Sequence, residues 1–140
     1  MTDKRVLTIQ DISCFGQCSL TVALPIISAC GIETAVIPSA VLSTHTSGFT
    51  GYTCRDLAED IPKIRDHWME TGIRFDAVYT GYLGTPEMIA DVLSIMRELG
   101  TENSINIVDP ATADEGVLYP AFDMAYVEEM KKLCAAADII

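Results

Sequence analysis

Two acidic residues follow one short apolar stretch of this chain at close spacing. Residues 105–108 have the composition of a buried strand, and Asp109 and Asp114 lie in the loop that comes directly after it. Paired carboxylates suit Mg²⁺, which keeps several water ligands and takes one or two carboxylates from a protein. Asp109 and Asp114 could therefore hold Mg²⁺ or lie beside a polyphosphate. Equally, Asp109 could only cap the turn while Asp114 is solvated.

A further acid, Asp11, follows the first apolar stretch, residues 6–9. Its carboxylate could hydrogen-bond a polar ligand. It could also close an Asx-turn with the backbone of Ser13, which is the commoner role of an aspartate directly after a strand.

Three other side chains lie in loops that are candidates for ligand binding. His45 and Thr46 belong to a long Ser/Thr/Gly segment, residues 43–51, and could contact a ring and a hydroxyl group or be ordinary loop residues. Tyr82 follows Gly81 and could stack on a flat ring or be a half-buried structural tyrosine.

The thiols offer little chemistry by themselves. The chain has 5 cysteines and no C-x-x-C pair, which favours reduced thiols over a disulfide framework. Cys14 and Cys18 with His45 could in principle hold a metal, but thiols without such a role are several times more common.

The elements that must position these residues alternate along the chain. Four short apolar stretches, 6–9, 34–37, 77–79 and 105–108, are separated by segments with helical periodicity, which predicts βαβ units and a parallel sheet. In open α/β sheets, ligands bind outside the carboxyl ends of the strands. The candidate residues all follow such ends, so we expect one small-molecule site there.

The predicted helices have recognisable ends. Ser19 is expected to cap a first helix with Leu20, Leu24 and Ile27 inward, Pro25 kinking it and Gly31 ending it. The second strand is expected to stop at Pro38. The remaining helical patterns are two short helices meeting at Pro62, a helix capped by Thr85 and closed by Gly100, and a last helix capped by Asp123.

Composition excludes several classes of function. The formal net charge is −11 and only 9 Lys and Arg residues are present, scattered along the chain, which argues against nucleic-acid binding. No run of about 18 apolar residues and no signal-peptide core occurs, so we expect a cytoplasmic protein without a membrane partner. The motifs G-x-x-x-x-G-K-[ST], G-x-G-x-x-G and G-x-S-x-G are also missing.

Residues 137–140 are predicted to start a fifth strand. Because an α/β fold rarely ends before such a strand has carried its ligand loop, we expect the 140 residues to be the N-terminal part of a longer protein.

Together these segments resemble the pyridoxal kinase branch of the ribokinase-like superfamily, most closely its bacterial pyridoxamine kinase-like members. The resemblance covers essentially the whole chain. It depends on residues 8–11 with Gly16, 43–46, 80–82, 108–110 with Asp114, and 118–120.

The resemblance implies a three-layer α/β/α sandwich with a mainly parallel sheet, of which residues 1–140 would be the N-terminal portion of a single kinase domain, truncated at its C-terminus. It also implies ATP-dependent phosphorylation, with Mg²⁺, of the 5′-hydroxymethyl group of a B6 vitamer, in a protein that forms homodimers. Asp11 and Thr46 would contact ring substituents, His45 would shape that pocket, Tyr82 would pack on the ring, and Tyr119 would border the site. Asp109 and Asp114 would lie by the ATP phosphates and the cation.

The family pattern is not fully matched. Many relatives have Ser in place of Asp11, and an acid there favours a cationic or protonated ligand group. Many also have Gly in place of Ala113, where the residue bears on how closely the loop approaches phosphate. The family's catalytic Asp, in a Gly-Thr-Gly-Asp segment, and its Asn-x-x-Glu segment are not found in residues 1–140, so we expect no kinase activity from this stretch alone.

Two alternatives remain open. Hydroxymethylpyrimidine kinase of thiamin synthesis has the same fold and reaction, but its Ser-Asp-Ser-Gly-Gly-Gly-rich first loop and Thr-Ala-Gln-Asn-Thr segment differ from residues 11–16 and 42–46 here. A non-catalytic remnant that binds a vitamer is the other alternative, should the native chain end at Ile140.

Overall fold

A mainly parallel sheet forms the centre of the protein. The computed structural model describes residues 4–140. Its five-stranded sheet has the order β3-β2-β1-β4-β5, and every neighbouring pair is parallel except β2 and β3. The strands are β1 (Arg5–Ser13), β2 (Glu33–Leu42), β3 (Cys54–Asp56), β4 (Phe75–Thr80) and β5 (Gly100–Val108).

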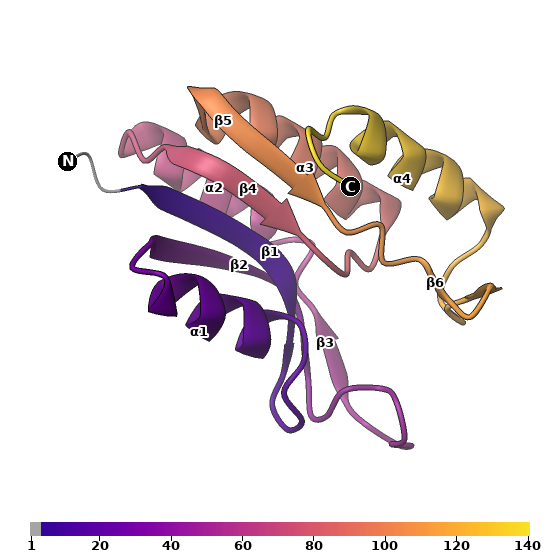
Figure 1. Ribbon diagram of the computed structural model, residues 1–140. Coiled ribbons are helices and arrows are strands. Elements are labelled where there is room, and N and C mark those ends of the chain that lie inside the picture. Colours follow the sequence, from indigo (N-terminus) through magenta and orange to yellow (C-terminus); the bar gives the residue numbers. More distant parts are fainter. Residues whose placement is uncertain (1–3) are drawn as a thin grey trace.

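Helices cover the two faces of this sheet unequally. One face carries α1 alone, and the other carries α2, α3 and α4 (Figure 1). The helices are α1 (Leu20–Ala29), α2 (Ile61–Glu70), α3 (Pro86–Leu99) and α4 (Met124–Ala135). A small hairpin of β6 (Ala113–Asp114) and β7 (Val117–Leu118) lies apart from the sheet. The predicted α/β class with a mainly parallel sheet is therefore confirmed.

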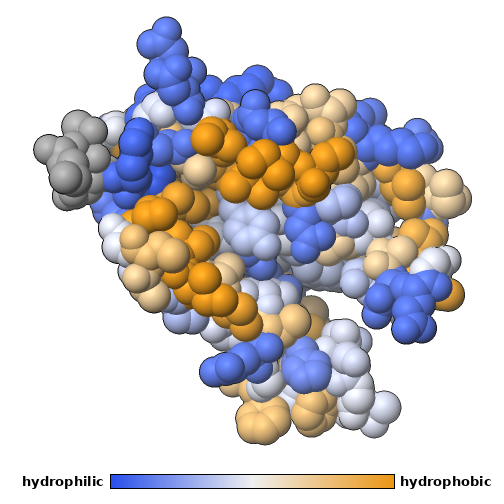
Figure 2. Space-filling model, viewed as in Figure 1, coloured by the Kyte–Doolittle hydropathy of each residue, from blue (hydrophilic) through white to orange (hydrophobic). Residues whose placement is uncertain are grey.

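The hydrophobic core lies between the sheet and the three-helix layer. Leu7 and Ile9 of β1 are fully buried in one cluster with side chains of α3 and α4. On the α1 side burial is much less complete, and Ile26 of α1 and Ile105 of β5 are 59% and 47% exposed. Figure 2 shows apolar side chains gathered over α1 and β5 on this face.

The second strand does not stop at Pro38, as the sequence had predicted, but continues to Leu42. Pro38 pairs with Gln10 of β1, while β3 pairs only with Ala40, Val41 and Leu42. One edge of β2 is therefore unpaired at Pro38, which is where a strand tolerates a residue without an N–H group. The first strand likewise extends beyond the apolar stretch 6–9, because β1 runs to Ser13.

The helix ends differ from the predictions at three points. Pro62 lies in the first turn of α2, where a proline is compatible with a helix, so one helix forms there instead of two. Ser19 precedes α1 with a φ of 50° and makes no capping hydrogen bond through its side chain. Gly100 begins β5 directly. The predicted caps of α3 and α4 are confirmed, since Thr85 and Asp123 accept hydrogen bonds from backbone N–H groups.

The segment after α4 lies beside β5, as a fifth parallel strand would. Ile139 forms an isolated parallel bridge with Ile107, and the Val108 N–H donates to the Ile139 carbonyl at 2.9 Å. Among the described residues, no helix combines the length and the apolar character that crossing a membrane requires.

Candidate functional site

A large groove opens on the α1 side of the sheet and reaches the carboxyl ends of its strands. Its volume is about 1380 Å³. Val6, Ala77 and Ile107 contribute from three adjacent strands, and Val22 and Ile26 of α1 line it as well. Most of the candidate residues from the sequence also line this groove: Asp11, His45, Thr46, Tyr82, Asp109 and Tyr119.

A bulge in β1 turns consecutive polar side chains into the groove. The register between β1 and β2 shifts between Gln10 and Ile12, and Gln10, Asp11 and Ser13 all line the groove. An extra residue in a strand re-aims the side chains beside it, and such bulges are common next to active sites. Asp11 is only 7% exposed. Its carboxylate accepts from the Ser13 hydroxyl at 3.4 Å, and Asp11 lies within β1, so its partner at Ser13 is the side chain and not the backbone of an Asx-turn.

His45 is held in place by aromatic and glycine neighbours. Its ring packs edge-on against Phe49, with 5.1 Å between the ring centroids. Gly16 approaches so closely that a Cβ atom there would lie 2.1 Å from the His45 Cδ2 atom. The glycine therefore allows His45 to sit beside the loop after β1, and Thr46 follows at the same end of the groove.

Tyr82 belongs to a row of stacked rings. Its ring stacks on Phe122 at 5.5 Å, and Phe122 stacks on Tyr126 at 3.7 Å. The Ser39 hydroxyl donates to the Tyr82 carbonyl at 2.7 Å. Burial, followed by the nearby Cys54 and Asp11, raises the pKa of the Tyr82 phenol. Tyr82 is therefore a fixed, protonated aromatic surface at the groove.

The two acids that follow β5 differ in their relation to the groove. Asp109 lines the groove, whereas Asp114 lies in β6, is exposed and does not line it. Both are close enough to Tyr119 for their charges to add to burial in raising the pKa of that phenol. Asp109 does not cap the turn through its side chain in the described chain; its backbone carbonyl accepts from the Ala111 N–H at 2.8 Å.

These acids fit Mg²⁺ only as part of a larger set of ligands. Within residues 4–140, no group of three or more His, Cys, Asp or Glu side chains is arranged to hold a metal ion, which removes support for Cys14, Cys18 and His45 as ligands. Mg²⁺ commonly takes one or two carboxylates together with water and substrate phosphates. The oxygen-only chemistry of Asp109 and Asp114 is compatible with that use.

Sequence reasoning missed several groove residues. Gln10, Ser13 and Cys54 line the groove, and Phe122 supports Tyr82, but none was predicted as a site residue. Gln10 has the same side-chain direction as Thr8 two residues earlier, so strand alternation could have found it. The bulge that adds Asp11 to the same face leaves no sequence signal. No lysine or arginine lines the groove over the described residues.

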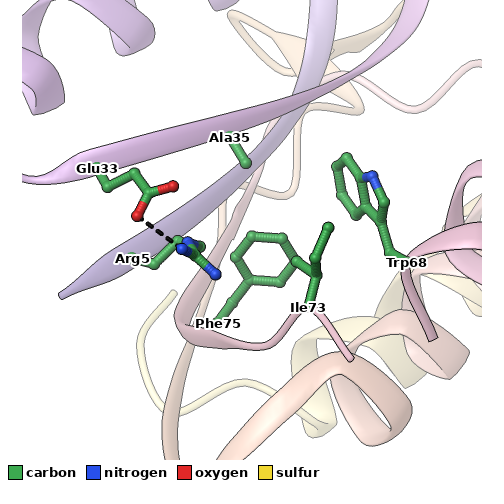
Figure 3. Close-up of a pocket in the computed structure, with 6 residues that line it drawn as sticks. All are labelled: Arg5, Glu33, Ala35, Trp68, Ile73 and Phe75. Carbon is green, nitrogen blue, oxygen red and sulfur yellow. Dashed lines mark ion pairs between the residues drawn. The ribbon is translucent and has the colours of Figure 1, made fainter. Parts of the chain in front are cut away.

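A second, smaller cavity lies at the opposite ends of the strands. Its volume is about 170 Å³, and Figure 3 shows the Arg5 and Glu33 ion pair beside the rings of Phe75 and Trp68. Arg5 and Glu33 begin β1 and β2, so this cavity lies at the amino ends of the strands. It is also smaller than the 300–1,000 Å³ usual for ligand sites. We therefore place the functional site in the large groove.

Pyridoxal kinases are among the known proteins to which this chain is similar. No family model matches the chain. A Lactobacillus plantarum pyridoxal kinase structure is 34% identical, with a TM-score of 0.88 over 93% of this chain and 46% of that one. The pyridoxal kinase of Sus scrofa is 29% identical over 99% of this chain and 45% of its own length. The chain belongs to the pyridoxal kinase family. It spans about half the length of these pyridoxal kinases and corresponds to an N-terminal portion of them.

Ligands have been observed in structures similar to this pyridoxal kinase homologue. A Bacteroides thetaiotaomicron protein described as a phosphomethylpyrimidine kinase was solved with pyridoxal; it is 40% identical, with a TM-score of 0.93 over 99% of this chain and 48% of that one. A Leishmania donovani pyridoxal kinase solved with ADP and pyridoxine has the same fold, with a TM-score of 0.89 over 97% of this chain and 50% of that one at 23% identity.

Proposed function

We propose that this chain is the substrate-binding part of an ATP-dependent kinase that phosphorylates the 5′-hydroxymethyl group of a B6 vitamer. The observation that carries the proposal is the groove itself. Asp11, Thr46, Tyr82 and Asp109 come from four separate segments of the chain and line it together near the carboxyl ends of the strands. The pyridoxal bound by the 40% identical Bacteroides thetaiotaomicron protein supports the same ligand class.

The vitamer would occupy the end of the groove formed by β1, β2 and β4. Tyr82 offers an aromatic surface for a flat pyridine ring, and stacking on Phe122 holds that surface in place. Asp11, Thr46 and His45 line the same groove and would contact ring substituents. The groove, at about 1380 Å³, exceeds the size usual for one small ligand, so it leaves space for a second substrate.

ATP would lie toward the end of β5. Asp109 lines the groove there, and Asp114 follows in the β6 hairpin. Because no lysine or arginine of the described residues lines the groove, we propose that Asp109 and Asp114 hold Mg²⁺ beside the phosphates. Bound Mg²⁺ would neutralise negative charge on the transferring phosphoryl group. Tyr119, near both acids, would border this part of the site.

The catalytic base is proposed to lie outside these residues. Neither Gly-Thr-Gly-Asp nor Asn-x-x-Glu follows the matched segments within the chain. Phosphoryl transfer depends mainly on positioning and on charge stabilisation, which those segments are expected to supply. We therefore expect the 140-residue chain to bind ligand without transferring phosphate, and the longer protein to be active.

The test is an ADP-release assay on both forms of the protein, with pyridoxal, pyridoxamine, pyridoxine and hydroxymethylpyrimidine as parallel substrates. In the longer form, Asp109→Asn should reduce turnover at least about tenfold, the lower end of what even outer-shell metal partners contribute. Glu115→Gln is the matched control, since this exposed acid lies in the hairpin turn and does not line the groove. Absence of turnover with every vitamer would refute the kinase.

Hydroxymethylpyrimidine is the second candidate substrate, because the Bacteroides thetaiotaomicron relative is described as a phosphomethylpyrimidine kinase although it was solved with pyridoxal. A clear preference for hydroxymethylpyrimidine in the same assay would replace the B6 assignment. Vitamer binding without turnover in the longer protein would instead support a non-catalytic binding role.

A further inference from the structure

Two side-chain hydroxyls hold the loop that carries Tyr82 to the groove. This loop, residues 81–85, joins β4 to α3. The Ser39 hydroxyl donates to the Tyr82 carbonyl at 2.7 Å, and the Tyr126 hydroxyl donates to the carbonyl of the next residue, Leu83. Each donor is 43 residues from its acceptor along the chain, and the two come from β2 and α4. The loop is therefore tied to two elements that are distant in the sequence.

The two carbonyls need such donors, because the loop lies outside the strands and helices. Leu83 is fully buried, and a buried carbonyl without a partner is costly. Ser39 and Tyr126 are only 0% and 3% exposed, so water competes little for the bonds that they make. The two hydroxyls therefore determine where these carbonyls point.

The direction of two successive carbonyls also determines how the Tyr82 side chain leaves the backbone. A peptide unit is planar, so the direction of its C=O group sets the orientation of the whole unit. The units that follow Tyr82 and Leu83 are both held in this way. Stacking on Phe122 at 5.5 Å then orients the ring. The place of the Tyr82 ring in the groove therefore depends on the two hydroxyls as well as on Phe122.

Neither hydroxyl belongs to a residue that lines the groove. Ser39 and Tyr126 are absent from the lining, whereas Tyr82 is part of it, so their effect on a bound ligand would pass through residues 81–85. The Tyr126 ring also stacks on Phe122 at 3.7 Å. A phenylalanine in place of Tyr126 would keep that stack and remove only the hydroxyl.

We propose that Ser39 and Tyr126 are positioning residues for Tyr82, and that vitamer affinity depends on their hydroxyls although neither touches the vitamer. This inference rests on the proposed vitamer site at Tyr82. A ring presented in another direction would lose part of its stacking contact with the pyridine ring. Because that contact is made before and during phosphoryl transfer alike, its loss should weaken binding without slowing the chemical step.

The test is calorimetric binding of pyridoxine, without ATP, to the 140-residue chain and to the longer protein. Ser39→Ala and Tyr126→Phe should each weaken binding about threefold to tenfold, as expected for loss of an aromatic contact. Neither substitution should weaken binding further in a Tyr82→Ala background. In the longer protein, each should raise KM by a similar factor and leave kcat nearly unchanged.

Thr71→Val is the matched control, because it removes a hydroxyl that also donates to backbone carbonyls. The Thr71 hydroxyl donates to the His67 carbonyl at 3.0 Å and to the Trp68 carbonyl at 3.2 Å, at the end of α2, and Thr71 does not line the groove. This variant should leave pyridoxine affinity unchanged. Thermal unfolding verifies that each variant is folded at the temperature of the binding measurement.

NMR spectra of protein with isotope-labelled tyrosine rings provide a second measurement that needs no ligand. The Tyr82 signal is assigned by its loss in Tyr82→Phe. Because Tyr82 stacks on Phe122, its ring signals should shift when Ser39→Ala or Tyr126→Phe moves the ring, and should not shift in Thr71→Val.

Three results would overturn the positioning role. The first is an unchanged Tyr82 signal in both hydroxyl variants. The second is an equal loss of affinity with and without the Tyr82 ring, and the third is an equal loss in Thr71→Val, either of which would indicate a general effect on the fold. If the unsubstituted protein bound no vitamer, the proposed function would be refuted, and the Tyr82 signal would still decide whether the hydroxyls position that ring.

Discussion

Replacing Gly16 by alanine isolates how the loop after β1 positions His45. Gly16 has a φ of +81°, in the left-handed region, and an added Cβ would lie 2.1 Å from the His45 Cδ2 atom and 2.7 Å from Nε2. No real Cβ contact is that short, so the His45 ring must move. Gly48, in the loop between β2 and β3, has a φ of +80° with no atom within 4 Å of an added Cβ.

The two glycines therefore separate the backbone cost from the steric cost. An L-residue in the left-handed region costs about 1–2 kcal/mol, and both Gly16→Ala and Gly48→Ala should lose that much. Gly16→Ala should also lose the edge-on contact between His45 and Phe49, and such aromatic pairs contribute about 0.5–1.5 kcal/mol. We expect Gly16→Ala to be less stable than Gly48→Ala by this second amount.

Urea denaturation of the two variants measures the difference, and the same pair in a His45→Ala background provides the control. With the ring removed, the two glycine substitutions should become equal in their effect on the free energy of unfolding. Equal stability in the presence of His45, or a difference that persists without it, would refute the claim that Gly16 acts through His45. Because His45 lines the groove, Gly16→Ala should also weaken vitamer binding more than Gly48→Ala does.

Other parts of the protein give further predictions. Tyr126→Phe removes the hydroxyl that donates to the buried Leu83 carbonyl, and should lower the free energy of unfolding by about 1–3 kcal/mol in urea titrations; an unchanged midpoint would contradict this. The Asp76 carboxyl accepts from Lys4, and this bond is the main cause that lowers its pKa. The stabilisation that the ionised Asp76 carboxylate gives is therefore complete above the ordinary carboxyl pKa of about 4 and is lost as the pH falls further. Asp76→Asn should be less stable than wild type at pH 7, and the difference in stability should disappear when unfolding is measured at acid pH. Cys54 is exposed, but partial desolvation and the negative charges of Asp56 and Asp11 raise the pKa of its thiol, so mass spectrometry at pH 8 should find it alkylated more slowly than a free model thiol; equal rates would contradict the raised pKa.

The alternation of short apolar stretches with helical periodicity was enough to predict the α/β class and the parallel sheet. Parallel strands in such folds are covered by helices and are therefore apolar along their length, so composition marks them in the sequence. The caps of α3 and α4 were also predictable, because Thr85 and Asp123 act on backbone N–H groups only three residues away. The sequence also predicted that the candidate site follows the strand ends, and six of its seven residues line one groove.

What only the tertiary structure decided depends on contacts between distant segments. Pro38 was predicted to end a strand, but pairing with β1 carries β2 past it. Asp11 was expected most often to close a local turn, but a bulge set by the pairing of β1 with β2 turns it into the groove beside Gln10. Asp114 was expected beside Asp109, but the β6 hairpin holds it outside the groove lining. Local spacing determines caps and strand composition because the interacting atoms are a few residues apart, whereas register, bulges and loop placement are determined by partners that the spacing does not reveal.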